Sequence, residues 1–437
     1  MEVTSPARTD VVVIGAGVAG LAATRVLVEA GLRVVVLEAR DRIGGRVLTH
    51  YPPGEAAPIE LGAEFVHGGS EAFDALCDEA GIERVPVSDT HWISAGGQLG
   101  RAVDADERIM QVLRRIDFAD RRPFAAWWRQ VGPTVSPPDR RLVQQYVVGF
   151  QAADPARMSV QALAKAAREE DEQSRPRNGY GPLVDVLGRV LQSPLVELRL
   201  GSAARGIRWR RGRVEVELVT GGLVAARAAV ITVPLGVLQA PEGAPGALEF
   251  QPALPERRRL WSQLGMGHAQ RVTLQMRPEF WSQPVLPQSL RDRGERDFGF
   301  LHTDEPEFFV WWGAAPAPFL VGWWGGAPPP AGADRNEMVQ RATCSLARAL
   351  AINPDVLAAQ RVAGYWHDWS SDPFSRGAYS FATAEGESVR RQAGEAEADT
   401  LFFAGEAFAK TLHLGTVHGA FERGQHVGAA VRQALGH

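Results

Sequence analysis

The chain contains very little cysteine and almost no lysine. Of its 437 residues, only Cys77 and Cys344 are cysteine and only Lys165 and Lys410 are lysine. Two cysteines cannot build a disulfide framework or a cysteine-rich zinc or iron–sulfur site. We therefore expect no metal centre and a reducing compartment, the cytoplasm. Nearly all of the positive charge belongs to arginine, which restricts the proton chemistry discussed below.

An excess of positive charge and long apolar runs are also missing. The formal net charge is -4 at pH 7, so there is no surplus of cations to neutralise a nucleic-acid backbone or an anionic bilayer. No segment approaches ~18 uninterrupted apolar residues, and the leader MEVTSPART is too short and polar for a signal peptide. We expect a soluble protein that binds neither nucleic acid nor membrane.

A strand–helix–strand pattern begins the chain. Residues 10–14 predict a buried strand, 18–31 a helix that ends at Gly31, and 33–39 a second strand. The connection between the first strand and the helix carries a G-x-G-x-x-G motif formed by Gly15, Gly17 and Gly20. In this context the motif predicts a dinucleotide site, because the glycines let backbone approach a pyrophosphate at the helix N-terminus.

The residues after the second strand favour FAD over NAD. Glu38 ends that strand where a carboxylate accepts both ribose hydroxyls, and it would repel the 2′-phosphate of NADP. Immediately afterwards, Gly44 and Gly45 allow a second close approach of the backbone, and Arg46 can pair with a phosphate oxygen. Two phosphate-facing turns suit a long, extended cofactor.

The pattern changes at least twice along the rest of the chain. From about Glu71 it is helical and aromatic, 195–235 reads as short alternating strands, and 308–326 reads as a hairpin around a proline-rich turn. Residues 401–406 predict a last strand, followed by a helix from Thr416. Nucleotide-type patterns at both ends imply a discontinuous domain with the middle of the chain inserted into it.

We therefore expect an α/β fold in which a Rossmann-type domain with a parallel sheet binds FAD and an inserted α+β domain binds the substrate. The expected FAD-binding domain comprises residues 1–85, 185–255 and 385–437, and the expected substrate-binding domain comprises residues 86–184 and 256–384.

Seven segments in order carry a resemblance to a known family: GAGVAGL, LEARDRIGGRV, IELGAEFVHGG, RNGYGPLVDVL, VITVPLGVL, LFFAGEA and GTVHGAFERGQHVGAAV. With them the chain resembles the flavin-dependent amine oxidases, which include monoamine oxidases, polyamine oxidases and lysine-specific histone demethylases. The length leaves no room for the helical insertion and extra domain of the demethylases. The resemblance implies that hydride passes from the carbon beside an amine nitrogen to flavin N5, giving an imine. Reoxidation by molecular oxygen would then yield hydrogen peroxide.

The resemblance also implies which residues hold FAD. Those expected at the ADP half are Gly15, Gly17, Gly20, Glu38, Arg40, Gly45 and Arg46, with Ala204 at the adenine. Those expected along the flavin and its ribityl chain are Gly62, Ala63, Trp369, Gly405, Glu406 and Val417. The helix that starts near Val417 would direct its positive end at the flavin, where it stabilises the anion of the reduced ring.

On the substrate side the resemblance is partial. Tyr379 would form one wall of an aromatic cage, and Thr416 stands where monoamine oxidases carry the second tyrosine. His67 matches a histidine beside the flavin of animal and yeast polyamine oxidases, and it either contacts substrate or serves the structure.

For six tryptophans the sequence leaves two locations open, the pocket and the hydrophobic core. Trp366 and Trp369 either face the flavin or belong to the core. In the pairs Trp311–Trp312 and Trp323–Trp324, strand alternation should send one member of each pair inward.

Two positions depart from the family pattern. Arg271 occupies the place of a lysine that family members hold near flavin N5, and arginine cannot release its proton near neutral pH. Rapid reoxidation by oxygen is therefore less secure than flavin binding, although oxygen remains the expected acceptor. Ala378 occupies the place of the cysteine that attaches flavin in monoamine oxidases, so we expect non-covalent FAD.

Other activities stay open at this stage. An L-amino-acid oxidase would need an arginine clamp for the substrate carboxylate, a flavin-dependent desaturase would need a larger apolar pocket, and a flavin-binding interaction protein would turn over slowly. The acidic run 169–172 is either a solvated helix end or a rim that attracts polycations. We favour a small-molecule amine, polyamine-like or substituted, as the substrate. The oligomeric state is not encoded in any pattern we recognise.

Overall fold

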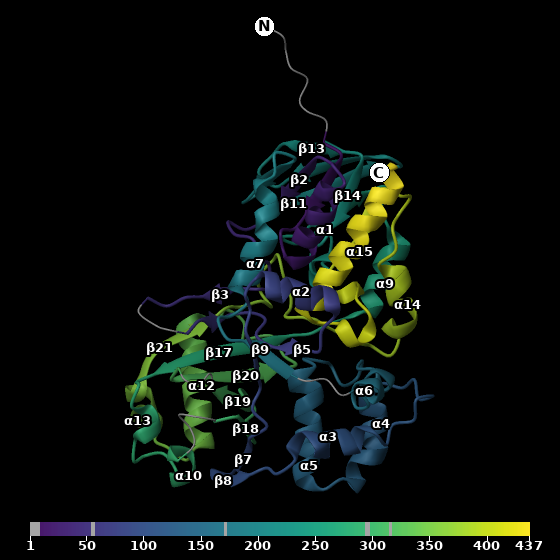
Figure 1. The fold of residues 1–437 in the computed structure, drawn as a ribbon. Coiled ribbons are helices and arrows are strands. Elements are labelled where there is room, and N and C mark those ends of the chain that lie inside the picture. The colour runs from purple at the N-terminus through teal and green to yellow at the C-terminus, as the bar shows by residue number, and fades with distance from the viewer. Residues whose placement is uncertain (1–8, 54–56, 170–172, 293–297, 314–316) are drawn as a thin grey trace.

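The computed structural model describes residues 9–53, 57–169, 173–292, 298–313 and 317–437. Figure 1 shows two halves, with the first helix, α1, and the last helix, α15, together in the upper one. The two halves meet around a small three-stranded sheet made of β5 (Val66–His67), β9 (Gln173–Pro176) and β6 (Arg84–Pro86). Of the acidic run, residues 170–172 lie outside the described residues.

A five-stranded parallel sheet forms the centre of the upper half. Its strands, in spatial order, are β10 (Val196–Arg199), β2 (Val34–Leu37), β1 (Val11–Ile14), β14 (Ala228–Ile231) and β23 (Leu401–Phe403). The four residues of β1, of β2 and of β14 are all buried, as expected for parallel strands covered on both faces. The α/β fold with a parallel sheet is thus confirmed.

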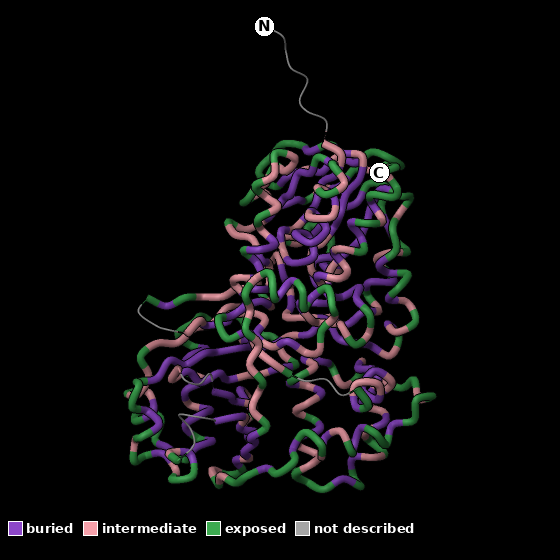
Figure 2. The backbone as a smooth tube through the Cα atoms, viewed as in Figure 1, coloured by how far each residue is buried: buried purple, intermediate pink, exposed green. Residues whose placement is uncertain are grey.

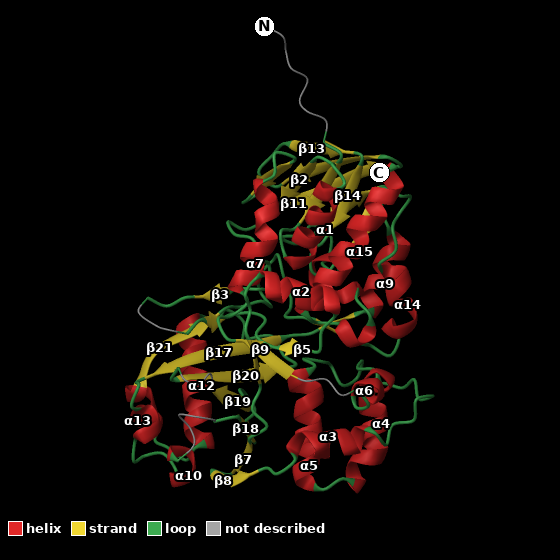
Figure 3. Ribbon diagram, viewed as in Figure 1, coloured by secondary structure: helices red, strands yellow, loops and turns green. Residues whose placement is uncertain are grey.

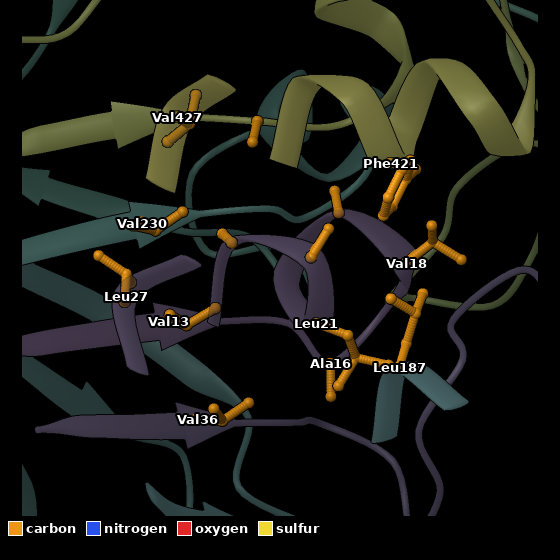
Figure 4. Close-up of a cluster of buried hydrophobic side chains, with 14 of the residues drawn as sticks. Val13, Ala16, Val18, Leu21, Leu27, Val36, Leu187, Val230, Phe421 and Val427 are labelled. Atoms are coloured by element: carbon orange, nitrogen blue, oxygen red, sulfur yellow. The ribbon is translucent and has the colours of Figure 1, made fainter. Parts of the chain in front are cut away.

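Helices cover one face of this sheet. Val13, Val36 and Val230 point into a core shared with α1 (Val18–Glu29), α7 (Gly181–Gly188) and α15 (Val417–Leu435) (Figure 4). Helices α1 and α15 approach closely because α15 carries glycine at the crossing. A Cβ on Gly424 would lie 2.3 Å from the carbonyl oxygen of Ala19.

A second, four-stranded sheet covers the other face. Its strands, in spatial order, are β13 (Leu223–Ala226), β12 (Arg213–Leu218), β11 (Ala204–Arg210) and β15 (Glu249–Gln251). Val12 and Val35, whose side chains alternate with those of Val13 and Val36, pack there against Ile207 and Val216. The period-2 alternation of each strand therefore divides its residues between the two cores.

A larger sheet lies in the lower half. Its seven strands, in spatial order, are β21 (Arg361–Trp366), β17 (Ala269–Met276), β20 (Phe319–Gly325), β19 (Val310–Gly313), β18 (Phe300–Thr303), β7 (His91–Ala95) and β8 (Gln98–Arg101). Strands β19 and β20 pair antiparallel, which confirms the expected hairpin, although residues 314–316 of its turn lie outside the described residues. Helix α12 (Arg335–Ala349) shares the hydrophobic core of this sheet.

A group of helices completes the lower half beside this sheet (Figure 3). It comprises α3 (Ala105–Leu113), α4 (Phe124–Val131), α5 (Pro137–Gln145) and α6 (Val160–Ala166). A π-helical turn, Tyr146–Phe150, continues α5. Such turns are often found at functional sites, and both aromatic residues of this one line the cavity described below.

The remaining elements are short connections around these layers. They are β3 (Thr49–His50), β4 (Ile59–Glu60), α2 (Glu71–Glu79), α8 (Leu235–Leu238), α9 (Pro255–Gln263), β16 (Gly265–Met266), α10 (Gln288–Arg291), α13 (Pro354–Gln360), β22 (Ser380–Phe381) and α14 (Gly386–Ala393). The interior strands of both halves are buried (Figure 2). Among the described residues, no helix is both long enough and apolar enough to cross a membrane.

Candidate active site

One cavity of about 760 Å³ runs through both halves of the molecule. It is lined by Gly15 and Glu38 at the carboxyl ends of β1 and β2, and by His67 and Tyr379 near the junction of the halves. Its far part is lined by residues of the lower half, among them His302. The carboxyl edge of a parallel sheet is the usual place for a ligand in α/β proteins.

The glycine motif forms a cradle that has no room for side chains. A Cβ on Gly20 would lie 1.9 Å from the carbonyl oxygen of Gly15, and Gly15 itself has a φ of 106°. The second glycine-rich turn lies directly beside the first, because Gly44 N–H donates to the Ala16 carbonyl over 2.9 Å. Two phosphate-type turns therefore meet at the N-terminus of α1, an arrangement that fits a dinucleotide such as FAD.

Glu38 lies at this cradle, with 4% of its surface exposed. Its carboxylate accepts hydrogen bonds from the backbone N–H groups of Ala16, over 2.8 Å, and Arg40, over 2.9 Å. A carboxylate has about four acceptor positions, so two remain for ribose hydroxyls. The Arg40 guanidinium donates to Asp372 over 2.7 Å and to Ser375 over 2.9 Å, which fixes it at the edge of the cavity.

Arg46 and Glu406 form an ion pair with 3.0 Å between Nη1 and Oε1. The Glu406 carboxylate also accepts N–H groups from Gly415, over 2.9 Å, and Ser380, and the Ser380 hydroxyl. Arg46 donates in addition to the carbonyl of Ala378 over 2.8 Å. Glu406 thus joins three segments of the cavity wall, which is more than the helix cap that its position alone would suggest.

Gly62 lies against Trp369, and Ala63 follows it along the cavity wall. The Trp369 indole donates to the Leu61 carbonyl over 2.7 Å, and a Cβ on Gly62 would be 3.4 Å from the indole and 1.9 Å from the Arg46 carbonyl oxygen. Both Ala63 and Trp369 line the cavity. Trp366, in contrast, packs against the core of the large sheet, so the two expected tryptophans separate.

The remaining expected cofactor residues also line the cavity. They are Gly17, Gly45, Ala204, Gly405 and Val417. Thr416 is the N-cap of α15: its hydroxyl accepts from Gly419 N–H over 3.0 Å and donates to the His413 carbonyl over 2.8 Å. This cap fixes the start of the helix whose positive end opens onto the cavity.

Tyr379 has an aromatic neighbour on β20, Trp323. Its ring is stacked with that of Trp323 at 6.4 Å between centroids, with 22° between the planes. Its hydroxyl donates to the Phe150 carbonyl over 2.6 Å, and burial raises the pKa of Tyr379 well above its ordinary value. The cavity therefore has an aromatic wall of Tyr379 and Trp323, held by a neutral phenol.

His67 points its ring between two phenylalanines. The centroid distances are 5.1 Å to Phe150, edge-on, and 6.0 Å to Phe65. Its Nδ1 is buried, and no described residue makes a hydrogen bond to it. Burial lowers the pKa of His67 to about 4, so the imidazole is neutral near pH 7 and presents an unused polar atom beside the cavity.

Arg271 forms an ion pair with Glu64, a residue that no sequence motif indicated. Its Nη1 lies 2.7 Å from Oε2 of Glu64, which also accepts the indole N–H of Trp312 over 3.0 Å. Both charged side chains are 8% exposed. The guanidinium lies over the Trp312 ring at 5.8 Å. A charged residue inside the otherwise apolar segment between Gly62 and His67 is the signal that could have revealed Glu64.

The tryptophan pairs divide as strand alternation predicts. Trp312 and Trp323 line the cavity, whereas Trp311 and Trp324 pack with the core of the large sheet. Trp312 and Trp323 also contact each other, at 5.9 Å between ring centroids. The aromatic wall near Tyr379 thus continues across two neighbouring strands.

These features define a class of protein. A cradle for a dinucleotide at the edge of a parallel sheet opens into an aromatic cavity, which is the arrangement of a dinucleotide-dependent oxidoreductase. Residues 18–432 match the family described as flavin-containing amine oxidoreductases. The chain belongs to this family, and it is an FAD-dependent amine oxidoreductase.

Individual relatives agree with this assignment. The chain is 28% identical to polyamine oxidase 2 of Arabidopsis thaliana over 461 residues, covering 97% of this chain and 87% of that protein. It is 26% identical to lysine-specific histone demethylase 1 homolog 2 of the same plant, covering 95% of this chain but only 57% of the demethylase. Wild-type putrescine oxidase bound to putrescine has a similar fold, with a TM-score of 0.75, 21% identity, and coverage of 97% of this chain and 98% of that chain.

These matches favour amine oxidation over the amino-acid oxidase, desaturase and low-turnover alternatives.

Proposed function

We propose that the protein oxidises a polyamine-like or substituted amine that carries a second polar or cationic group. The observation that carries this proposal is the neutral aromatic surface of Tyr379 and Trp323 in the same cavity as the neutral His67. The names of the relatives give further support, since these are polyamine oxidases and a putrescine oxidase.

The aromatic surface lowers the free-energy cost of removing a proton from the substrate amine. A primary alkyl amine resembles lysine, with a pKa near 10.4, so losing its proton at pH 7 costs about 4.6 kcal/mol. An apolar site favours the neutral amine by desolvation, whereas an unpaired carboxylate would favour the ammonium ion. The one carboxylate that we find beside Arg271, that of Glu64, is already paired. We propose that Tyr379 flanks the reacting nitrogen and that His67 lies near the carbon that loses hydride.

We propose that FAD is held by the residues of the cradle and the cavity wall. Glu38 would bind the ribose and the glycine turns the pyrophosphate, while Glu406 would bind the ribityl chain and Val417 N–H the pyrimidine edge. FAD, when bound, supplies the hydride acceptor. Ala378 in place of an attachment cysteine supports non-covalent binding, and we further propose molecular oxygen as the electron acceptor.

The division into domains is also a proposal. Residues 1–85, 185–255 and 385–437 would bind FAD, and 86–184 and 256–384 the substrate. Leu183 and Trp261 nevertheless pack in the two cores that flank the parallel sheet. We therefore propose that the second FAD-binding segment extends over the whole of α7 and α9, Gly181–Gly188 and Pro255–Gln263. The free cysteines Cys77 and Cys344 support a cytoplasmic location.

Anaerobic reduction of the FAD-bound protein tests the substrate class. Monoamines, diamines, polyamines and L-amino acids are mixed in turn with the enzyme, and bleaching of the flavin absorbance is followed. We expect diamines or polyamines to reduce the flavin with the highest ratio of limiting rate to Kd. If only amino acids reduce the flavin, the proposal is wrong and the protein is better described as an amino-acid oxidase.

A further inference from the structure

Two buried histidines face each other in the lower half of the cavity. His91 lies on β7 and His302 on β18, and their rings are stacked at 5.3 Å with 11° between the planes. Nδ1 of His91 is 3.0 Å from Nε2 of His302. The residues are 5% and 8% exposed, and both line the cavity. One hydrogen therefore lies between these two nitrogen atoms. Which of the two nitrogens carries it decides which ring nitrogens remain as hydrogen-bond acceptors.

The side-chain amide of Gln145, at the end of α5, determines which atoms donate and which accept in this series of hydrogen bonds. Its Nε2 donates to the carbonyl of Thr303 over 2.7 Å, so its Oε1 is the atom 3.2 Å from Nδ1 of His302. That Nδ1 must carry a hydrogen to donate to Oε1. Because burial lowers the pKa of His302 to about 3, its Nε2 is a bare acceptor. The hydrogen between the rings thus belongs to Nδ1 of His91.

With this direction, Nε2 of His91 is the ring atom that faces the Asp106 carboxylate. A neutral His91 with hydrogen on Nδ1 has a lone pair on Nε2. That Nε2 is buried, makes no hydrogen bond to a described residue, and lies 3.3 Å from Oδ2 of Asp106. At this distance a lone pair on Nε2 would repel the carboxylate, whereas a hydrogen on Nε2 would bind it. Burial opposes ionisation of Asp106, but the hydrogen bond to His91 lowers the pKa of Asp106 overall. Either His91 takes up a proton, or a ligand with several N–H groups reaches both acceptors.

The location favours a ligand. An aromatic path leads from His67 to this pair through Phe65 and Phe300, with successive ring centroids 6.0, 6.5 and 5.2 Å apart. The Asp106 side chain lines the cavity, yet 72% of it is exposed, so it lies on the solvent side of the cavity. An alkyl chain lying along these rings would bring a second nitrogen to Asp106.

We propose that Asp106 and His91 form the subsite for the second, cationic nitrogen of the substrate, with His302 and Gln145 as positioning residues that hold His91 as an acceptor. An alkylammonium group offers three N–H donors and a positive charge, which suits a carboxylate beside an imidazole lone pair. The aromatic rings that lead to Asp106 suit the alkyl chain of an organic cation. This subsite rests on the proposed function, because it presupposes an amine substrate.

Among the described residues that line this part of the cavity, Arg114 does not supply a donor to the pair. Arg114 of the same helical segment lines the cavity, but its guanidinium is occupied by Glu107 over 2.8 Å and by the Ala167 carbonyl over 3.0 Å. Asp89, before β7, and Glu169, after α6, also line the cavity and add negative charge. The field in this part of the cavity therefore attracts a cation.

Asp106→Asn tests the subsite, with Asp104→Asn as the matched control. Both variants remove one negative charge at the start of α3, but Asp104 does not line the cavity, and its φ of 51° is one that asparagine tolerates. Straight-chain diamines of increasing length are compared with monoamines of the same length, using anaerobic flavin reduction. We expect Asp106→Asn to raise the Kd of the preferred diamine at least tenfold, while the matched monoamine and the limiting rate change less than twofold.

The tautomer of His91 gives a second readout, recorded without amine and then with amine on the anaerobically reduced enzyme, which cannot oxidise the amine further. Long-range ¹H–¹⁵N correlation spectra of the resting FAD-bound enzyme, with the signal assigned through His91→Phe, should show hydrogen on Nδ1 alone. The diamine should shift this signal and the monoamine should not. An imidazolium in the resting enzyme would overturn the subsite, and so would an equal effect of Asp106→Asn on diamine and monoamine. If no amine reduces the wild-type flavin, it is the proposed function that fails.

Discussion

Nη1 of Arg271 lies 2.7 Å from Oε2 of Glu64, and this buried ion pair stands in the wall of the cavity. The resemblance to the amine oxidases implies a lysine at the position of Arg271. On that expectation, a mobile single-point donor would be replaced here by a planar cation that a carboxylate fixes. Nε of Arg271 is buried and makes no hydrogen bond to a described residue. The pair therefore affects both the stability of the fold and the chemistry at the cavity.

The first prediction concerns stability. Arg271→Met leaves the Glu64 carboxylate buried with the indole N–H of Trp312, at 3.0 Å, and the longer contact to Arg175, at 3.5 Å. We expect a loss of about 3 kcal/mol in the free energy of unfolding, most of which Glu64→Gln should restore in the double variant. Urea unfolding at one fixed FAD concentration measures all four proteins of the cycle. Strictly additive effects would show that the two residues are not coupled.

The second prediction concerns reoxidation. Arg271→Lys should speed the reaction of the reduced enzyme with oxygen and leave anaerobic reduction by amine largely unchanged, because a lysine ammonium can position one water molecule. Stopped-flow spectroscopy follows each half-reaction separately. A lysine variant that reoxidises no faster would mean that Arg271 serves the ion pair alone.

The third prediction concerns the attachment of FAD. Ala378 N–H donates to the Gly267 carbonyl and its own carbonyl accepts from Arg46, so this position offers backbone contacts and no thiol. We expect acid precipitation to release intact FAD into the supernatant, as measured by chromatography and absorbance. Flavin that remains with the precipitated chain would contradict non-covalent binding.

The fourth prediction concerns the substrate site. His67→Ala and Tyr379→Ala should each lower the limiting rate of flavin reduction more than threefold, equivalent to more than ~0.7 kcal/mol. Tyr379→Phe serves as the control, because it keeps the ring beside Trp323 and loses only the hydrogen bond to the Phe150 carbonyl. We expect that variant to stay within threefold of wild type. If neither alanine variant passes the threefold limit, the assignment of the site is wrong.

The same variants fix the origin of the pH dependence. The reductive rate at limiting substrate should rise with pH as the amine loses its proton. Burial lowers the pKa of His67 to about 4, so His67 does not titrate in this range. The rising limb should follow the pKa of each amine and should keep its position in His67→Ala.

The fifth prediction concerns stability against acid. His418, at the start of α15, is 1% exposed, and burial lowers its pKa to about 4. A depressed histidine pKa adds stability above the unfolded value of about 6.5 and loses it as pH falls towards 4, at most about 3 kcal/mol here. Replacing His418 with Phe should therefore flatten the dependence of the unfolding free energy on pH between those values, as measured by urea unfolding.

Other buried titratable groups also change the dependence of the unfolding free energy on pH, and the direction of each pKa shift gives the sign of the change. His67 and His302, with pKa values lowered by burial to about 4 and about 3, destabilise the fold towards acid in the same way. Glu60 acts oppositely, because burial raises its pKa to about 7, so its contribution is present below about 4.5 and is lost as pH rises through 7. An unchanged slope in the His418 variant would contradict the buried, neutral state of that histidine.

Much of the cofactor side was predictable because it depends on residues close together in the sequence. Gly15, Gly17 and Gly20 dictate one backbone turn between a strand and a helix, and Glu38 follows at the end of the next strand. A short segment with a fixed periodicity determines its own local conformation. Strand alternation likewise predicted that one member of each tryptophan pair would face inward, but the structure decided that these are Trp312 and Trp323.

The sequence by itself therefore determined the α/β class, the dinucleotide cradle, the family resemblance and the unusual residues at positions 271 and 378. Only the tertiary structure decided that Glu64 pairs with Arg271, that Trp323 stacks on Tyr379, and that His91 meets His302 across 211 positions of the chain. These encounters depend on how distant strands align and pack, and no local pattern encodes the partner of a side chain on another element. The residues expected to bind the cofactor thus lie in contiguous sequence motifs, whereas the residues at the substrate end come together only when distant strands and helices pack.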